Sequence, residues 1–164
     1  RRIIQAWRHV VIWGAGLNRH GVKVDSYPDW LKERPWVGVR DIYPGLRWVP
    51  CPSCMSPLFD SVPAAQCEAV AYEHRDFRLP PSGLPRQSND TSIAEALRFL
   101  ASGRTVLTNS YNGGYWAALL GRRVQFCDPL FSSKFFYMPA RFDLNEGRDA
   151  NLKFRDDLRA EFGV

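Results

Sequence analysis

A strand-turn-helix-strand pattern in the last third of the chain constrains the fold most. Residues 105–110, "TVLTNS", are mainly β-branched and apolar, which predicts a buried strand. An aromatic-rich helical segment, "YWAALLG", and a further strand, "RRVQFCD", follow directly. Two strands joined by a helix usually lie parallel in one sheet, so this unit predicts α/β architecture.

The rest of the chain repeats this alternation. Further strands are predicted in "HVVIWGAG" (9–16), "WVGVRD" (36–41) and "EAVAYEH" (68–74), and helices in "DSYPDWLKE", "TSIAEALRFLASG" and "DANLKFRDDLRAEFG". In the last of these, apolar residues at helical spacing predict a helix that docks on a sheet, with Leu152, Phe154, Leu158 and Phe162 on one face. The Pro-rich segments 43–66 and 79–90 predict irregular loops.

The bulk composition is that of an ordinary soluble domain. The 164 residues are 45% hydrophobic and 24% charged, and no apolar run is long enough to span a membrane. The N-terminal segment lacks a signal-peptide pattern, and the chain starts with Arg, which leaves the true N-terminus open. We expect a cytoplasmic protein without a membrane span.

The net charge of +5 favours anionic partners such as phosphorylated small molecules. The basic residues occur in pairs and form no Lys/Arg block, and none of the common nucleic-acid-binding motifs is present. We therefore expect no nucleic acid as the main partner.

The four cysteines include one close pair, Cys51 and Cys54, in "CPSC". Such a pair is compatible with half of a zinc site, completed by Cys67, His74 or His20, with a redox pair, or with an incidental feature. Because a second pair at metal-ligand spacing is absent from the sequence, we expect no metal and no cofactor. A zinc-stabilised interaction domain stays open as a lesser alternative.

Candidate ligand-binding residues follow the predicted strands, because ligands of parallel α/β sheets bind beyond the carboxyl ends of the strands. Asn109, Ser110 and Asn112 follow one strand, and Gly113 would let a ligand or another backbone segment approach. An equally weighted alternative is that the polar residues cap the next helix and the glycines pack it on the sheet.

Two other strand ends carry charged groups. Arg40 would hold a carboxylate or phosphate, and Asp41 would orient it or act as a base, although a plain surface ion pair explains both residues as well. His74 follows the predicted strand 68–74 and supplies a titratable imidazole, although a histidine on a strand is more often structural.

A polar loop follows the last predicted strand. Ser132, Ser133 and Lys134 there offer hydroxyls and an ammonium group that suit a phosphate. A single surface lysine is usually only solvated, so this loop gains weight only together with the other segments.

Four segments in order, "IWGAGLN", "VGVRD", "LTNSYNGGYWAALLG" and "SSKF", resemble the polysaccharide pyruvyl transferase family. The resemblance runs over residues 10–139 and is strongest over 106–135. It implies a GT-B-like fold of two Rossmann-type halves and transfer of a pyruvyl ketal from phosphoenolpyruvate to a sugar hydroxyl of a polysaccharide.

The resemblance assigns roles by position, with two departures. Arg40 corresponds to the strand-end arginine that would meet the donor. Asn112 stands where the family has a histidine before glycine, and an asparagine cannot act as a general acid. The chain is also short for two halves, so residues 1–35 are interpreted as the end of an N-terminal half and 36–164 as a C-terminal Rossmann-like half.

The leading hypothesis is thus a transferase that moves a pyruvyl or glycosyl group from a phosphorylated donor to a glycan. Its alternative is a non-catalytic sugar- or nucleotide-binding module of the same fold. The predicted catalytic residues are Asn112, His74 and Asp41, and the predicted substrate-binding residues are Arg40, Asn109, Ser110, Gly113, Ser132, Ser133 and Lys134.

Overall fold

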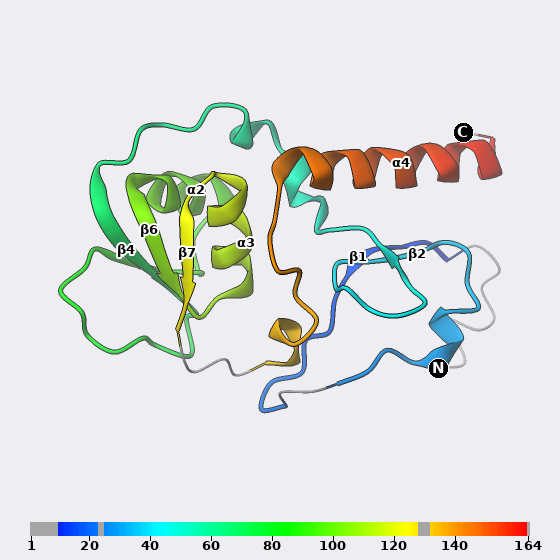
Figure 1. The fold of residues 1–164 in the computed structure, drawn as a ribbon, viewed down its shortest axis with the longest axis horizontal. Helices are drawn as coiled ribbons and strands as arrows, with labels where there is room; N and C mark the ends of the chain where they lie inside the picture. Colours follow the sequence, from blue (N-terminus) through cyan, green and yellow to red (C-terminus); the bar gives the residue numbers. More distant parts are fainter. Residues whose placement is uncertain (1–9, 23–24, 128–131, 164) are drawn as a thin grey trace.

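The computed structural model describes residues 10–22, 25–127 and 132–163. These residues form an α/β fold with two separate parallel sheets, joined by a connecting segment and by a C-terminal helix (Figure 1). The predicted α/β class with a Rossmann-like parallel sheet is therefore confirmed at this level.

The first sheet has the strand order β1-β2-β3 and is parallel throughout. Its strands are β1 (Ile12–Ala15), β2 (Val37–Val39) and β3 (Arg47–Trp48). The register shifts between Ile12 and Ala15, where Gly14 has a φ of 63°. Such a left-handed conformation favours glycine, which accounts for the glycine at this irregularity within β1.

The second sheet has the order β5-β4-β6-β7, again all parallel. Its strands are β4 (Cys67–Glu73), β5 (Arg86–Ser88), β6 (Gly103–Thr108) and β7 (Arg123–Phe126). The chain reverses its direction of strand addition between β4 and β6. Ligands of open α/β sheets bind at such a switch point, so the carboxyl ends of β4 and β6 are where a site is expected.

Two helices cover one face of the second sheet, α2 (Ile93–Ser102) and α3 (Tyr111–Leu119). Ser92 and Glu95 form a capping box that starts α2. Side chains of the central strands, Val70, Tyr72 and Val106, are buried in one cluster with residues of both helices. The unit predicted over 105–127 is therefore confirmed as β6-α3-β7.

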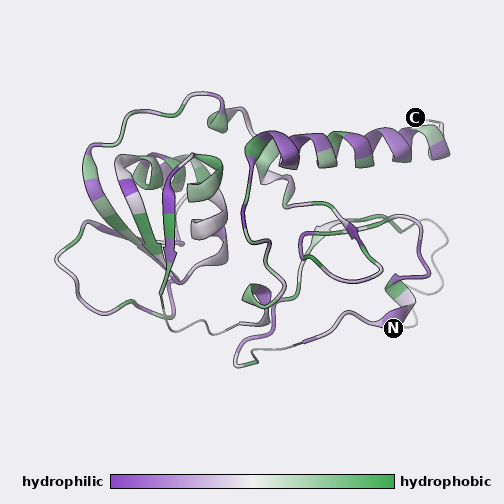
Figure 2. Cartoon of the chain, viewed as in Figure 1, coloured by the Kyte–Doolittle hydropathy of each residue, from purple (hydrophilic) through white to green (hydrophobic). Residues whose placement is uncertain are grey.

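Helix α4 (Leu144–Phe162) connects the two sheets, because it starts beside the connecting segment and packs along the first sheet (Figure 1). Phe154 and Leu158 are buried with Val49, and the ring of Trp13 meets that of Phe154 edge-on at 5.3 Å. Figure 2 shows that α4 is mainly hydrophilic, with apolar residues at intervals. The predicted docking helix is confirmed, although it begins five residues earlier, since Asp143 caps it through the N–H of Glu146.

Two details differ from the sequence predictions. Strands β3 and β5 lie in segments that were predicted as irregular loops. They are two and three residues long and lack apolar alternation, so only pairing with distant strands defines them. The predicted helix over 25–33 is reduced to one 3-10 turn, Asp29–Leu31.

The connecting segment separates the two sheets along the chain. It runs from Trp48 to Cys67 and contains the 3-10 turns Pro52–Met55 and Pro57–Phe59. The division predicted at residue 35 stays a prediction, and strands on either side of that residue, β1 and β2, pair within the first sheet.

Candidate functional site

The carboxyl ends of both sheets meet, and we call their junction the cleft, which we define by Arg40, Asp41, His74, Tyr111 and Lys134. Direct contacts span it. The guanidinium of Arg40, at the end of β2, lies 4.2 Å from the ring centroid of Tyr111, the first residue of α3. Two polar sheet edges therefore face each other at the place where α/β sheets usually bind ligands.

The side chain of Arg40 is held in place by the loop that follows β1. One of its nitrogens, Nη2, donates to the carbonyl of Leu17 at 3.2 Å, and its side chain is 15% exposed. A Cβ on Gly16 would lie 1.9 Å from Arg40 Nε, so the guanidinium rests on the Gly16 backbone. The glycine that follows β1 thus makes room for the arginine that follows β2.

Asp41 is buried and anchors the loop after β1. Its Oδ2 accepts hydrogen bonds from the backbone N–H of Leu17 at 2.9 Å and from Tyr27 Oη at 2.6 Å. Burial raises the pKa of this carboxyl, and the hydrogen bonds from Tyr27 and Leu17 oppose the rise. With one oxygen fully engaged, Asp41 is better suited to position Arg40 and Leu17 than to remove a proton from a substrate.

Two polar atoms in the cleft lack a hydrogen-bond partner among the described residues. They are Arg40 Nε and Asp41 Oδ1, which lie 3.9 Å apart. A buried donor or acceptor without a partner is costly, and such atoms commonly mark a place for a bound polar group. These two atoms are shielded from solvent, so the junction is polar on the inside where Arg40 meets Asp41.

Lys134 enters the cleft from the 3-10 turn Ser133–Phe135. Burial, and to a smaller extent the positive charge of Arg40, together lower the pKa of its ammonium to about 8. The two cations are 94 positions apart in sequence, and the charge of Arg40 acts on Lys134 across the junction. Their role as the residues that bind a donor anion stays a prediction.

The neighbouring serines tie the Lys134 loop to the loop after β1. Ser132 Oγ donates to Asn18 Oδ1 at 3.2 Å, and Ser133 Oγ accepts from the backbone N–H of Arg19 at 3.0 Å. Both side chains are buried. Ser132 and Ser133, predicted to bind substrate, therefore carry contacts that place the Lys134 loop.

His74 lies across the cleft at the end of β4. Its ring and that of His20 are perpendicular, with centroids 5.9 Å apart. Burial lowers the pKa of His74, and the positive charge of Lys134 lowers it further, so neutral pH favours the uncharged ring. The N–H of Asp76 donates to Nδ1 at 3.2 Å, which leaves the proton of the neutral ring on Nε2.

Asn109 is a structural part of this edge. Its Oδ1 accepts from the backbone N–H of His74 at 2.8 Å, and its Nδ2 donates to the carbonyl of Phe77 at 2.7 Å. It is fully buried and joins the ends of β4 and β6. These contacts favour the interpretation of Asn109 as a positioning residue for His74.

Ser110 and Gly113 fit the packing alternative. Ser110 caps α3 by accepting from the N–H of Gly113 at 3.4 Å. A Cβ on Gly113 would lie 2.5 Å from Tyr72 Cδ1, so the glycine permits close packing of α3 against β4. Asn112 is exposed on the first turn of α3, and no hydrogen bond within the described part of the chain involves its side chain.

Three contributors to the cleft were not predicted from the sequence. Tyr27 hydrogen-bonds Asp41, His20 faces His74, and Tyr111 supports Arg40. Tyr111 belongs to the segment "LTNSYNGGYWAALLG", so the sequence resemblance could have pointed to it. Tyr27 and His20 lie in loops without a motif, and only the tertiary structure reveals their neighbours.

The cysteine pair is integrated into the connection between the sheets. Cys54 is buried, and its Sγ lies 3.4 Å from Asn151 Nδ2 of α4, while Cys51 Sγ lies 3.2 Å from Ser53 Oγ. Over residues 10–22, 25–127 and 132–163, no group of three or more His, Cys, Asp or Glu side chains is placed to hold a metal ion. Within the same ranges, no helix is long and apolar enough to cross a membrane.

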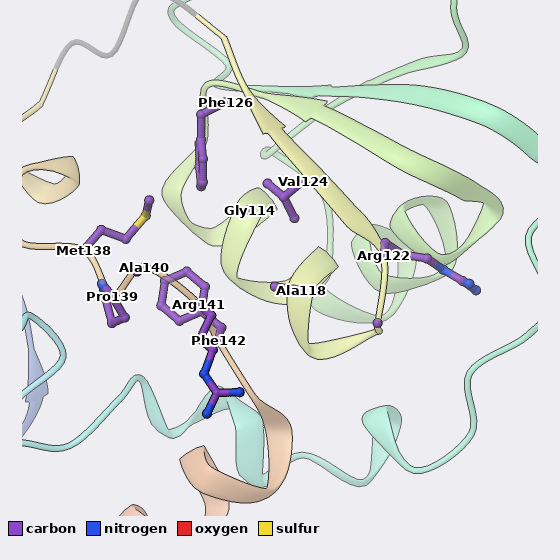
Figure 3. A pocket seen from close by; sticks show the side chains of 11 residues that line it. Gly114, Ala118, Arg122, Val124, Phe126, Met138, Pro139, Ala140, Arg141 and Phe142 are labelled. Atoms are coloured by element: carbon purple, nitrogen blue, oxygen red, sulfur yellow. The ribbon is translucent and has the colours of Figure 1, made fainter.

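A separate pocket of about 580 Å³ lies beside α3 and β7 (Figure 3). Its walls include Val124 and Phe126 from β7 and Met138 and Phe142 from the segment before α4. None of the residues that define the cleft lines it. The pocket and the cleft are thus different features.

Neither a protein-family model, nor a curated protein, nor a solved structure matches the chain. The fold defines a protein of the Rossmann-like α/β class with two parallel sheets, and Arg40, Asp41 and Lys134 lie among the charged residues where the sheets meet.

Proposed function

We propose that this protein is a transferase that binds a phosphorylated donor in the cleft and moves a pyruvyl or glycosyl group to a glycan hydroxyl. The observation that carries the proposal is the position of Arg40, which follows β2 and lies on Tyr111 at the start of α3, together with the charge that it exerts on the half-buried Lys134. The GT-B-like resemblance supplies the reaction class, and the two facing sheets are compatible with it.

The electrostatics favour an anionic ligand. Two cations near one another repel, and this repulsion contributes to the lowered pKa of Lys134. A phosphate between them would relieve the repulsion and accept charge-assisted hydrogen bonds from Arg40 and Lys134.

The chemistry with phosphoenolpyruvate as donor balances without a cofactor. A proton adds to the methylene carbon, a sugar hydroxyl forms a bond to the central carbon, and the phosphate leaves with the electrons of the broken C–O bond. A second hydroxyl then closes the ketal, and the hydroxyl protons pass to phosphate or solvent. Arg40 and Lys134 would stabilise the leaving phosphate, and His74 and His20 would be the imidazoles available for proton transfer.

The alternative, a non-catalytic sugar- or nucleotide-binding module, has its own support. Asn112 replaces the histidine that the resemblance implies, and Asp41 is engaged in fixed hydrogen bonds. Neither Asn112 nor Asp41 is then available for proton transfer, whereas Arg40 and Lys134 could still bind an anion.

Calorimetry with phosphoenolpyruvate and with UDP-glucose tests donor binding, and phosphorus NMR with added oligosaccharides tests release of phosphate or of UDP. Saturable binding with release supports the transferase. Saturable binding without release, over a range of acceptors, supports the binding module. If neither donor binds, the cleft does not have the role proposed for it.

A further inference from the structure

The cysteine pair lies on the first 3-10 turn of the connecting segment, beside the start of α4 (Figure 1). Helices of two different parts of the fold hold the backbone of this turn. Tyr115 of α3 donates through Oη to the carbonyl of Cys51 at 3.0 Å, and Arg148 of α4 donates through Nε to the carbonyl of Cys54 at 3.0 Å. A chemical change at these cysteines would therefore act where α3 and α4 meet the connecting segment.

The backbone of the turn holds Cys51 and Cys54 close together. The N–H of Cys54 donates to the carbonyl of Cys51 at 3.3 Å, which closes a turn of four residues, and Pro52 restricts φ inside it. Such a turn brings its first and last Cα atoms within about 7 Å, and a disulfide spans Cα atoms about 4.4 to 6.8 Å apart. The turn thus holds the two residues at a spacing that a disulfide can bridge.

The two thiols differ in their access to solvent. Cys51 is half-buried, whereas Cys54 is fully buried. Burial raises the pKa of the Cys54 thiol, so this thiol stays protonated at neutral pH. A reagent in solution would therefore meet Cys51 first, and Cys54 would react next from inside the turn.

The surroundings of Cys54 allow its sulfur to move. The Sγ atom lies 3.4 Å from Asn151 Nδ2, a contact that a disulfide would weaken. The same Nδ2 also donates to the carbonyls of Gly147 at 2.8 Å and of Pro50 at 3.3 Å. Because Asn151 keeps these acceptors, disulfide formation would leave no buried donor without a partner at this place.

The other two cysteines lie outside the turn. Cys67 begins β4, and its Sγ donates to the carbonyl of Ser102 at 3.4 Å. Cys127 follows β7, and its Sγ donates to the carbonyl of Gln125 at 3.6 Å. These two thiols serve as internal controls for any reaction of the pair.

We propose that Cys51 and Cys54 are a site of reversible thiol–disulfide exchange, at which a small-molecule disulfide such as glutathione disulfide oxidises the pair. The thiolate of Cys51 attacks one sulfur of glutathione disulfide, the S–S bond breaks, and one glutathione leaves and takes up a proton. Cys54 then gives its proton to solvent and attacks Cys51 Sγ, which forms the new S–S bond and releases the second glutathione. The pair loses two electrons and two protons, and glutathione disulfide gains them. This inference does not depend on the proposed transferase function.

A redox titration of the folded protein tests the inference. The protein is equilibrated in glutathione buffers from fully reducing to fully oxidising, its remaining thiols are alkylated, and the intact protein and its peptides are weighed by mass spectrometry. We expect the loss of two reactive thiols, a disulfide that maps to Cys51 and Cys54, and full reversal by dithiothreitol. The double variant Cys67→Ser/Cys127→Ser is the control and should be oxidised at the same ratio of reduced to oxidised glutathione.

Single variants test the order of attack. Cys54→Ser should accumulate a mixed disulfide between Cys51 and glutathione, because the sulfur that would release the glutathione is missing. Cys51→Ser should keep Cys54 reduced in the folded protein, because Cys54 is buried. Circular dichroism checks the fold of both variants, and the wild-type titration decides the inference even where a variant does not fold.

Three outcomes overturn the inference. The first is the absence of a disulfide between Cys51 and Cys54 at every glutathione ratio. The second is pairing that involves Cys67 or Cys127 to the same extent. The third is a disulfide that forms in urea and not in the folded protein, because the fold would then hold the thiols apart.

Discussion

The guanidinium of Arg40 lies over the ring of Tyr111, with 4.2 Å between Cζ and the ring centroid. Arg40 follows β2 of the first sheet, and Tyr111 begins the helix after β6 of the second. A cation–π contact of this kind contributes about 0.5 to 2 kcal/mol, depending on how far it is removed from water. The main cation of the cleft is therefore positioned by both sheets.

Arg40→Gln should weaken binding of a phosphorylated donor by about 1.5 to 3 kcal/mol, the range for a hydrogen bond to a charged group. Glutamine keeps part of the side-chain volume on Gly16 and removes the charge. Calorimetry measures the change. Arg104→Gln is the control, since Arg104 is 69% exposed and lies near the amino end of β6. An equal loss in both variants would indicate a general effect of net charge.

Gly16→Ala should displace Arg40 without removing it. The added Cβ would lie 1.9 Å from Nε, so the guanidinium has to leave its present position. Donor affinity should fall about as much as in Arg40→Gln. In the control Gly147→Ala, the new Cβ meets Cys54 Sγ at 3.6 Å, an ordinary contact, and helix α4 should gain about 0.5 to 1 kcal/mol. Unchanged donor affinity in Gly16→Ala would contradict the role of Arg40.

Lys134 should make donor binding depend on pH. Its pKa of about 8 means that the charge is present at pH 7 and lost as the pH rises through 8 to 9, so affinity for an anion should fall over that range. Calorimetry between about pH 6.5 and 9.5 would measure the affinity on both sides of this pKa. In Lys134→Met the affinity should be lower at pH 7 and flat with pH. A wild-type profile without a change between pH 7 and 9 would contradict this assignment.

The same lysine should cost stability at neutral pH. Because its pKa falls from 10.5 in the unfolded chain to about 8 in the fold, the unfolded state binds more protons between these values. The free energy of unfolding should therefore rise with pH across this window. Lys134→Met should be more stable than wild type at pH 7 by about 1 to 2 kcal/mol, less than the full shift because the side chain is partly solvated. Urea titrations at pH 7 and 10 should show that this difference shrinks at the higher pH.

Asn112→His should leave the fold intact, since Asn112 is exposed on the first turn of α3. If the imidazole supplies a missing general acid, the transfer rate should rise by part of the roughly 10²- to 10⁴-fold that such catalysis provides. Phosphate release measures the rate. High wild-type activity that the variant does not improve would assign the proton transfer to another group such as His74. A variant without any gain in binding or rate would favour the packing interpretation of this turn.

The hydrogen bonds of Asn151, and not a bound zinc ion, should stabilise the connection between the two sheets. Its Nδ2 donates to the carbonyl of Gly147 at 2.8 Å and lies 3.4 Å from Cys54 Sγ, and its Oδ1 accepts from Trp13 Nε1 at 2.6 Å. Asn151→Ala should lower the free energy of unfolding by about 1 to 3 kcal/mol, because Trp13 loses its acceptor. Lys153→Ala on the exposed face of α4 is the control. A chelator that lowers Tm more than Asn151→Ala, with zinc found by metal analysis, would revive the zinc alternative.

Local patterns accounted for much of the secondary structure. The apolar run of β6 and the helical spacing in α2 and α4 predicted their elements, because each pattern involves residues that are neighbours in sequence. The start of α2 was expected at Asp90 or Thr91, and Ser92 caps it instead. Strands β3 and β5 escaped prediction because they are two and three residues long and, unlike Val37–Val39 of β2, contain no apolar run.

The residues predicted for the candidate site fall into two groups, those that could bind a ligand and those whose contacts are structural. Arg40 and Lys134 were predicted as anion-binding residues from their places at a strand end and in a polar loop. Ser132, Ser133, Asn109 and Ser110 were nominated for the same reason, yet their hydrogen bonds hold loops and a helix end together. A polar residue at a strand end has the same sequence signature whether it serves a ligand or the backbone.

The sequence by itself determined the strands and helices with clear periodicity, the parallel α/β class and the excess of positive charge. The tertiary structure alone decided that Arg40 meets Tyr111, that Tyr27 holds Asp41, and that the charge of Arg40 acts on Lys134. Periodicity and capping act over a few residues, whereas burial, the pKa of Lys134 and the contacts of the cleft arise between groups that only folding brings together.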